Sequence, residues 1–383
     1  MKTSTGAVWA WRQVRELMAL GTDVHVALPP GGDMVARYED IGAPVHLLPP
    51  GLSSRGAQRL PAVLTRIRRL VTELRPDIVH MHTVAAALVV RAALGRRHAT
   101  PRVFQVPGPL HLEHGPFRRG ELATAGPLDR WLASCEHTRR LYLAAGVPED
   151  RVTMSYYGTD VDRYAPGPRG RLRTELDLPE GTKVVGMVAF MYRPKRYLGQ
   201  RRGLKGHEDL IDAVALCLRR RDDVTAVFVG GAWAGASRYE ASVRRYGRDR
   251  CGDRAVFLGT RTDVADLYRD FDVAVHPSHS ENVGGAVESL LMGVPTVATR
   301  VGGLPELVRA GETGWLVPPK SPADLCDALL DAMSHPDRAH HLASRGRTLA
   351  AHLFDVRRTA AEVRALYDRI LGRNEPSLGR RAV

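Results

Sequence analysis

The chain has 383 residues, more than one hydrophobic core accommodates, so two domains of roughly 150–200 residues are expected. With 44% hydrophobic and 25% charged residues, the composition excludes disordered, collagen-like and coiled-coil proteins. The formal net charge of +13 comes mostly from scattered arginine, which argues against a nucleic-acid-binding tail; it leaves a nucleotide diphosphate, an anionic lipid surface and RNA, in that order, as anionic partners.

The first half of the chain alternates between helical and strand-like hydrophobic patterns. A helix is predicted over residues 8–20, ending at Gly21 as a typical C-cap, and a strand follows at 23–28. Such alternation predicts a parallel sheet covered by helices on both faces. The pattern continues with strands at 45–49, 77–82, 102–106 and 130–134 and helices at 60–74 and 85–94.

A doubly wound domain begins with a strand, yet residues 1–6 form a loop-like segment directly before the first helix. In the usual strand order the missing strand is central, so its absence leaves two other strands without a partner. We therefore expect the first strand to be missing from this chain, with the true start upstream of Met1.

Proline and glycine cluster between Tyr164 and Thr182, where we place the domain junction. A second alternating series follows, so the predicted fold is α/β, with two Rossmann-like, doubly wound parallel-sheet domains at 1–165 and 183–354. Ligands bind at the carboxyl ends of such strands, so the two domains are expected to face a central cleft. A final helix at 355–371 is long enough to cross back to the first domain. The second series has strands at 184–190, 226–229, 255–258, 273–276 and 296–299 and helices at 208–219, 234–248, 264–269 and 285–292.

The cysteines and the hydropathy pattern indicate the cellular compartment in which the chain is expected to work. The four cysteines lie far apart without a C-x-x-C pair, so neither a zinc site nor a disulfide framework is predicted, and a reducing cytoplasm fits. The chain has no run of about 18 apolar residues and no signal-peptide pattern, so any membrane contact is expected to be peripheral, at the inner face. The cysteines are Cys135, Cys217, Cys251 and Cys326.

The most informative stretch is 278–306. Its first part leads from an apolar strand through Gly284 and Gly285 into a helix, a setting in which the backbone approaches a ligand closely and the first-turn N–H groups suit a diphosphate. Glu281 precedes this turn and Glu288 lies inside the helix. The alternative is that both glutamates are ordinary helix-start residues favoured by the helix dipole.

The context of this stretch carries a family resemblance. Residues 297–306 read VATRVGGLPE, and residues 311–319 read GETGWLVPP. Together with 278–295, they make the chain similar to the retaining glycosyltransferases of family four over nearly its whole length. The resemblance implies the GT-B fold, a nucleotide-sugar donor and no metal or other cofactor.

The resemblance also implies roles for the residues of the turn. Glu281 is expected near the donor sugar, where it orients donor or acceptor, and Glu288 at the ribose hydroxyls. The family usually has seven residues between these glutamates, whereas six separate them here. The backbone of the turn is expected to bind the sugar hydroxyls and the phosphate through Asn282, Val283, Gly284 and Gly285.

A basic loop follows the first strand of the second domain and supplies cations for the departing phosphate. Lys205, before Gly206, matches the family's lysine. Phe190 stands where the family usually has arginine, so Arg193 or Arg201 is expected to replace it. The alternative is a solvated basic loop.

Four residues of the first domain are expected to contact the donor sugar or the acceptor. His82 ends a strand and is expected to touch the donor sugar, with a structural histidine as the alternative. His111 and Glu113 follow the next strand and are expected to contact the acceptor, as is Gly6. A zinc site at His111, Glu113 and His114 is an open but incomplete alternative.

The predicted activity is transfer of a sugar, with retention, from a nucleoside-diphosphate sugar, most commonly UDP-linked, to a hydroxyl of a glycan, a lipid-linked precursor or a natural product. The alternatives are another GT-B enzyme, such as an epimerase or a phosphorylase, and a nucleotide-sugar-binding pseudo-enzyme. No nucleic acid is expected as a partner. The helix at 60–74 combines an apolar face with Arg66, Arg68 and Arg69, so it either lies on an anionic membrane or is an ordinary surface helix.

Overall fold

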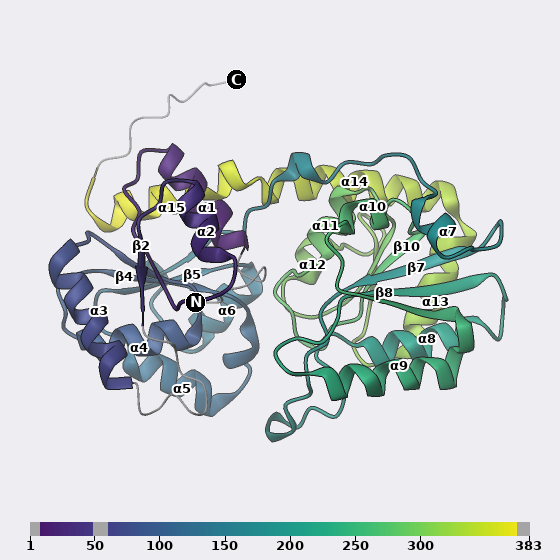
Figure 1. Cartoon of the computed structure of the whole chain (residues 1–383), viewed down its shortest axis with the longest axis horizontal. Helices are drawn as coiled ribbons and strands as arrows, with labels where there is room; N and C mark the ends of the chain where they lie inside the picture. The colour runs from purple at the N-terminus through teal and green to yellow at the C-terminus, as the bar shows by residue number, and fades with distance from the viewer. Residues whose placement is uncertain (1–7, 49–59, 374–383) are drawn as a thin grey trace. The chain divides into compact units, whose positions relative to one another are not determined.

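The computed structural model describes residues 8–48 and 60–373, which divide into two compact units. Unit 1 contains the residues up to Asp160 together with those from Leu353 onward, and unit 2 contains Val161–His352. Figure 1 shows the course of the chain through both units. Each unit is an α/β structure built on parallel strands.

The described strands of unit 1 form two sheets. A pair, β1 (Val26–Leu28) and β2 (Val45–Leu47), is separate from the four-stranded sheet β3-β4-β5-β6. All neighbours are parallel. No strand among residues 8–48 and 60–373 hydrogen-bonds to both sheets, which agrees with the expectation that two strands of this half lack their central partner. The larger sheet consists of β3 (Val79–Met81), β4 (Arg102–Val106), β5 (Asp129–Ala133) and β6 (Val152–Met154).

Helices cover these sheets. Gly21, with φ +78°, ends the first of them, and the Thr83 hydroxyl caps α4 by accepting from the Ala86 N–H at 3.1 Å. The chain's last helix returns to unit 1, where it packs beside α1, as Figure 1 shows, and buries Val363 with Leu17. The helices are α1 (Val8–Ala19), α2 (Met34–Asp40), α3 (Leu60–Leu74), α4 (Val84–Leu94), α5 (Gly115–Thr124), α6 (Glu136–Ala144) and α15 (Val356–Ile370).

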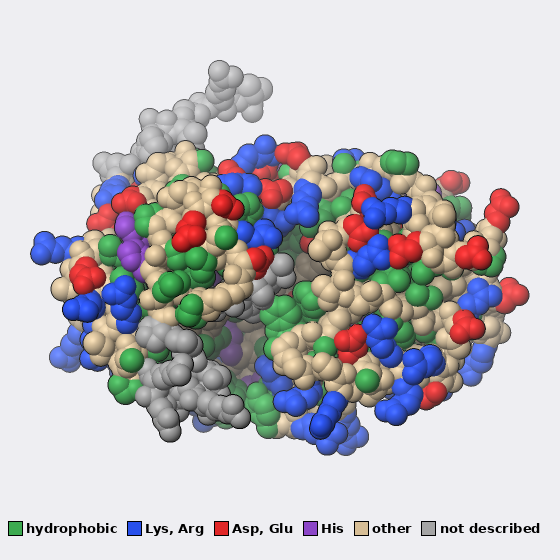
Figure 2. All heavy atoms as spheres, viewed as in Figure 1, with side chains coloured by type: hydrophobic (Ala, Val, Ile, Leu, Met, Phe, Trp, Pro, Cys, Tyr) green, Lys and Arg blue, Asp and Glu red, His purple; other side chains and the backbone are tan. Residues whose placement is uncertain are grey.

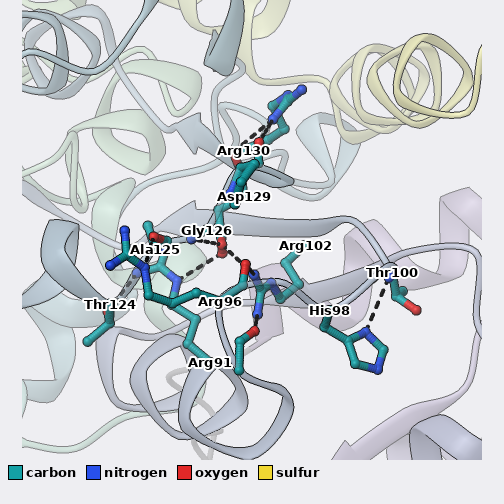
Figure 3. Close-up of polar contacts among 12 residues, drawn as sticks. Arg91, Arg96, His98, Thr100, Arg102, Thr124, Ala125, Gly126, Asp129 and Arg130 are labelled. Carbon is teal, nitrogen blue, oxygen red and sulfur yellow. Dashed lines mark hydrogen bonds and ion pairs between the residues drawn. The ribbon is translucent and has the colours of Figure 1, made fainter.

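A buried ionic cluster joins the elements of unit 1 (Figure 3). Arg91 of α4 contacts Glu121 of α5 at 2.6 Å and Asp129 of β5 at 2.9 Å, and Arg102 of β4 contacts Asp129 at 2.7 Å. All four side chains are inaccessible to solvent. Two positive and two negative charges balance, which is the condition under which buried ions are tolerated. The Gly126 N–H also donates to Asp129.

Unit 2 contains one six-stranded parallel sheet in the order β12-β11-β10-β7-β8-β9. The central strands are runs of small and β-branched residues that are almost entirely buried, as expected for strands covered on both faces. The strands are β7 (Lys183–Val188), β8 (Val224–Val229), β9 (Ala255–Gly259), β10 (Val273–His276), β11 (Thr296–Thr299) and β12 (Trp315–Val317).

Helices lie on both faces of this sheet, with α8 and α9 on one face and α10 and α11 on the other (Figure 1). Leu210 of α8, Val243 of α9 and Leu329 of α13 belong to one buried core with the strands. The helices are α7 (Arg171–Glu175), α8 (His207–Cys217), α9 (Ser237–Cys251), α10 (Val264–Tyr268), α11 (Ala286–Leu291), α12 (Leu304–Leu307), α13 (Pro322–Ser334) and α14 (Pro336–Phe354).

Candidate functional site

The strand order of unit 2 marks one position as a binding site. From β7 the chain runs outward to β8 and β9, and it then returns to β10 on the other side of β7. The connections therefore leave in opposite directions at the carboxyl ends of β7 and β10, where doubly wound sheets bind their ligands. The loop 189–206 follows β7, and the turn 277–285 follows β10. Both segments contain residues that the sequence predicts to bind the donor.

Lys205 and Glu281 form an ion pair that joins these two segments. Their side chains are 19% and 13% exposed. The other Glu281 oxygen accepts from the Asn282 N–H at 3.1 Å, and the Ser278 hydroxyl lies 3.3 Å from the oxygen that faces the lysine. A largely buried carboxylate is thus fixed by one cation and two neutral donors.

The pair changes the protonation behaviour of both groups. Burial opposes the charged form of Lys205, but the Glu281 carboxylate outweighs it and raises the pKa of the lysine above its usual value. Burial likewise opposes ionisation of Glu281, but the lysine charge and the hydrogen bonds lower the pKa of this carboxyl below its usual value. Both groups are therefore charged at neutral pH.

Glycines allow the turn to fold tightly around Glu281. Gly284 has φ +50°, and a Cβ there would lie 2.8 Å from the Glu281 carboxylate. Gly302, with φ +55°, approaches the Glu281 carbonyl so closely that a Cβ would lie 1.6 Å from its oxygen. The Gly303 N–H donates to the Asn282 carbonyl at 2.7 Å. The two glycine motifs of the sequence thus pack on each other.

The rest of the turn has one unusual feature. Val283 is 3% exposed and belongs to the apolar interior, and Gly285 immediately precedes α11. Asn282 is 5% exposed, yet neither atom of its side-chain amide has a hydrogen-bond partner among the described residues. Unsatisfied buried amides are rare in folded proteins, so this amide is a candidate for contact with a ligand.

Glu288 of α11 is half-buried and accepts a hydrogen bond from the Tyr164 hydroxyl at 2.8 Å. Tyr268, at the end of α10, is fully buried, and its hydroxyl has no hydrogen-bond partner among the described residues. Burial raises the pKa of Tyr268 well above its usual value, and the negative charge of Glu288 adds to this effect. The carboxylate of Glu288 is therefore held by one phenol and lies near a second.

Two family models match the chain. A model described as Glycosyltransferase Family 4 matches residues 6–163, and one described as Glycosyl transferases group 1 matches residues 197–335. The chain belongs to the family 4 glycosyltransferases. The resemblance stated from the sequence is thus confirmed.

Curated relatives agree with this assignment. The chain is 33% identical over 242 residues to a D-inositol 3-phosphate glycosyltransferase of Gordonia bronchialis, a match that covers 61% of this chain and 50% of the relative. It is 32% identical over 285 residues to the protein of the same name from Nocardia farcinica, with 72% and 58% covered. The chain thus spans between half and three-fifths of the length of these relatives.

Solved structures confirm the GT-B fold. The Anabaena protein HepE, crystallised with UDP and glucose, superimposes with a TM-score of 0.77 at 24% identity, covering 93% of this chain and 95% of HepE. The sucrose-phosphate synthase of Thermosynechococcus elongatus gives a TM-score of 0.76 at 20% identity, covering 96% and 94%.

The arginines predicted to replace the family's phosphate ligand, Arg193 and Arg201, are both exposed and make no ion pair within the described residues. Arg202 instead contacts Asp209 at 2.6 Å and Asp212 at 2.7 Å, which ties the loop to α8. Arg193 and Arg201 therefore both have charge to offer a ligand.

His82, in unit 1, directly follows β3 and is 6% exposed. Neither of its ring nitrogens has a hydrogen-bond partner among the described residues, and burial lowers its pKa to about 4. The ring contacts Trp9 at 5.1 Å between centroids. A neutral imidazole with both nitrogens unsatisfied is poorly explained by a purely structural role.

The predicted acceptor residues lie in the segment after β4. His111 is half-buried, lies 3.1 Å from the Tyr142 hydroxyl, and has its pKa lowered to about 4 by burial. Glu113 is exposed, and Gly6 lies outside the described residues. His111, Glu113 and His114 do not gather into a metal-binding group, and residues 8–48 and 60–373 contain no other cluster of three such ligands.

Two parts of the site were not predicted from the sequence. The contact between Tyr164 and Glu288 joins residues 124 positions apart, and no local pattern indicates it. The second part is the support of the basic loop: His279, in the turn after β10, contacts the same Asp209 that binds Arg202. An acidic residue in the first turn of α8, following an arginine-rich loop, is the only signal that could have suggested this contact.

Proposed function

We propose that the chain transfers a sugar from a nucleoside-diphosphate sugar to an acceptor hydroxyl, with retention of anomeric configuration. The observation that carries the proposal is the convergence of Lys205, Glu281 and the glycine turn at the carboxyl ends of β7 and β10, with Glu288 in the helix that follows. In this arrangement unit 2 binds the donor. Asn282, Val283, Gly284 and Gly285 line the sugar and phosphate, and the Glu288 carboxylate accepts hydrogen bonds from the ribose hydroxyls.

The chemistry requires stabilisation of the diphosphate as it departs. Lys205, charged because of Glu281, is placed to offset that negative charge, and Arg193 or Arg201 adds a second cation from the loop. The departing phosphate oxygen accepts the proton of the acceptor hydroxyl on the same face of the sugar, so no protein base is needed. Glu281 orients the donor sugar or the acceptor.

We propose UDP as the nucleotide and leave the acceptor class open among glycans, lipid-linked precursors and natural products. The complexes of HepE with UDP and with UDP-glucose support the choice of UDP. The name of the curated relatives makes inositol phosphates the first acceptors to test.

Unit 1 is proposed to supply the acceptor side. His82 would contact the donor sugar as a neutral hydrogen-bonding group, and His111 and Glu113 would contact the acceptor, together with Gly6 from outside the described residues. The four cysteines are buried and form no disulfide within the described residues, which supports a reducing compartment such as the cytoplasm. No helix within 8–48 or 60–373 has the length and apolar character needed to cross a bilayer.

The first experiment measures binding of UDP, GDP and ADP by calorimetry, followed by UDP release with a panel of UDP-sugars and acceptors. Glu288→Ala and Lys205→Ala are each expected to abolish transfer, whereas the control Glu312→Ala, an exposed site, leaves it unchanged. Wild-type turnover in both site variants would refute the assignment.

The same assays separate the alternatives. Tight UDP binding without turnover on any acceptor would indicate a nucleotide-sugar-binding protein, for which the shortened spacing between Glu281 and Glu288 is the supporting observation. Conversion of a donor without any acceptor would instead indicate an epimerase.

A further inference from the structure

The segment 193–201, here called the basic finger, has a charge pattern that the transfer reaction does not explain. It contains four cations, Arg193, Lys195, Arg196 and Arg201, and no acidic residue. All four side chains are exposed, and none forms an ion pair with another described residue. The proposed reaction assigns the diphosphate to Lys205 and to Arg193 or Arg201, so Lys195 and Arg196 at the tip have no partner in it.

The basic finger is folded in a defined way. At its base, the Met191 N–H donates to the Gly231 carbonyl at 2.9 Å and the Trp233 N–H to the Met191 carbonyl at 3.0 Å. At its tip, the Leu198 N–H donates to the Lys195 carbonyl at 2.8 Å, and the following glycine has φ +72°. The turn therefore presents its side chains on a fixed backbone.

An aromatic ring occupies the tip of this turn. Tyr197 is 74% exposed, the most exposed large hydrophobic side chain among the described residues, and it lies between Arg196 and the half-buried Leu198. A tyrosine that directly follows two cations suits the boundary between lipid head groups and acyl chains, because the ring is apolar while its hydroxyl remains hydrated. A surface loop that contacts only water gains nothing from such a ring.

The surroundings of the finger are also basic. The loops after β7 and β8 lie side by side, joined by the bridge between Met191 and Ala232. In Figure 1 they lie at the lower edge of unit 2, and Figure 2 shows lysine and arginine side chains gathered along that edge. The net charge of +13 also attracts the whole chain to anionic surfaces.

We propose that the basic finger is a docking site for an anionic phospholipid surface, with Lys195 and Arg196 at the head-group phosphates and the Tyr197 ring in the head-group region. The helix first considered for this role, α3, does not fit, because its apolar residues Val63 and Ile67 pack inside unit 1. The finger needs no apolar helix face, and it places the membrane next to the donor site.

Each cation near an anionic leaflet strengthens binding about fivefold. Sedimentation with vesicles of phosphatidylglycerol and phosphatidylcholine is therefore expected to show binding that falls at least tenfold in Lys195→Gln/Arg196→Gln and disappears with pure phosphatidylcholine. The matched control is Arg345→Gln/Arg347→Gln, which makes the same change in net charge on exposed positions of α14 and is expected to bind like the wild type. UDP affinity is expected to be unchanged in both variants, which shows that a loss of vesicle binding does not come from a damaged donor site.

A second measurement locates the contact. All four native cysteines are buried, so Tyr197→Cys offers one reactive thiol for a polarity-sensitive fluorophore. A blue shift of its emission on adding anionic vesicles is expected, with no shift for a label at Arg345→Cys. Three results would each overturn the proposal. They are no binding of the wild type to vesicles, an equal loss of binding in both glutamine variants, and binding of the wild type to a soluble anionic polysaccharide but not to vesicles.

Discussion

Replacing Lys205 by methionine tests the ion pair at the centre of the site. The variant keeps most of the apolar stem and removes the ammonium group that neutralises Glu281. The carboxylate, 13% exposed, then retains only the Asn282 N–H at 3.1 Å and the Ser278 hydroxyl at 3.3 Å. A buried charge without its counter-ion is strongly unfavourable, so we expect the variant to lose stability as well as activity.

The size of the loss follows from the partners that remain. Leaving a buried polar group unsatisfied costs about 1–3 kcal/mol, and more when the group is charged; because Glu281 keeps two donors, we expect a loss of about 2 kcal/mol. For a unit of this size that corresponds to a fall of about 4–8 °C in melting temperature.

The pH dependence identifies the cause. In the wild type the pKa of Glu281 is lowered, so its stabilisation is present above the unfolded pKa of about 4.3 and is lost as pH falls through the folded value. The raised pKa of Lys205 contributes stability that is complete below the unfolded lysine value and is lost above it, as pH rises through the folded value. In Lys205→Met, Glu281 loses the lysine charge that most strongly lowers its pKa while burial still opposes its ionisation, so the loss of stability is largest near neutral pH and shrinks towards pH 4.

The assay is thermal and urea unfolding of Lys205→Met, Glu281→Gln and the double variant between pH 4 and 8. The double variant removes both charges, so it is expected to recover most of the stability that Lys205→Met loses while remaining inactive. Additive effects of the two substitutions, or a deficit that is the same at pH 4 and pH 7, would refute the reasoning.

Three further predictions test other parts of the molecule. Tyr164→Phe removes the hydrogen bond to Glu288 and should weaken UDP binding about tenfold while leaving binding of 2′-deoxy-UDP nearly unchanged, as calorimetry would show. Gly302→Ala should abolish UDP binding because its Cβ meets a carbonyl oxygen at 1.6 Å, whereas Gly311→Ala, with a similar positive φ but open space, should bind normally. Asp129→Asn should lower the free energy of unfolding by about 3–5 kcal/mol, because two buried arginines share this carboxylate; a loss below about 1 kcal/mol in urea would contradict this account.

The sequence predicted the elements that carry a regular hydrophobic pattern. The helix α3 and the strands β4, β10 and β11 have the bounds that periodicity indicates, because each buries a defined set of side chains. Elements with weaker patterns were missed. The helix α5, with few apolar residues, and the three-residue strands β6 and β12 show why: such elements are defined by their neighbours in the fold more than by their own residues. The missed elements are β6, β12, α2, α5, α6, α7, α12, α13 and α14.

Site residues that act locally were easier to identify than those that act through distant contacts. The turn after β10 and Lys205 lie beside glycine motifs, and these signals are visible in the chain itself. The pairing of Lys205 with Glu281 cannot be seen in the sequence, because 76 residues separate the two. It depends on β7 and β10 being neighbours in the sheet. The ionic cluster around Asp129 was missed for the same reason, because nothing local distinguishes a buried arginine from the many exposed ones.

Two glycine contacts close the turn that carries Glu281, in the stretch whose glutamate spacing is one residue shorter than the family's. Gly284 adopts a left-handed conformation beneath the Glu281 side chain, and Gly302 approaches the Glu281 carbonyl from the other side. Neither contact tolerates a Cβ, so both glycines are needed for the turn that directs the Glu281 carboxylate to Lys205. In the proposed donor complex, the diphosphate would compete with Glu281 for the lysine, and the released carboxylate would then be available to orient the sugar.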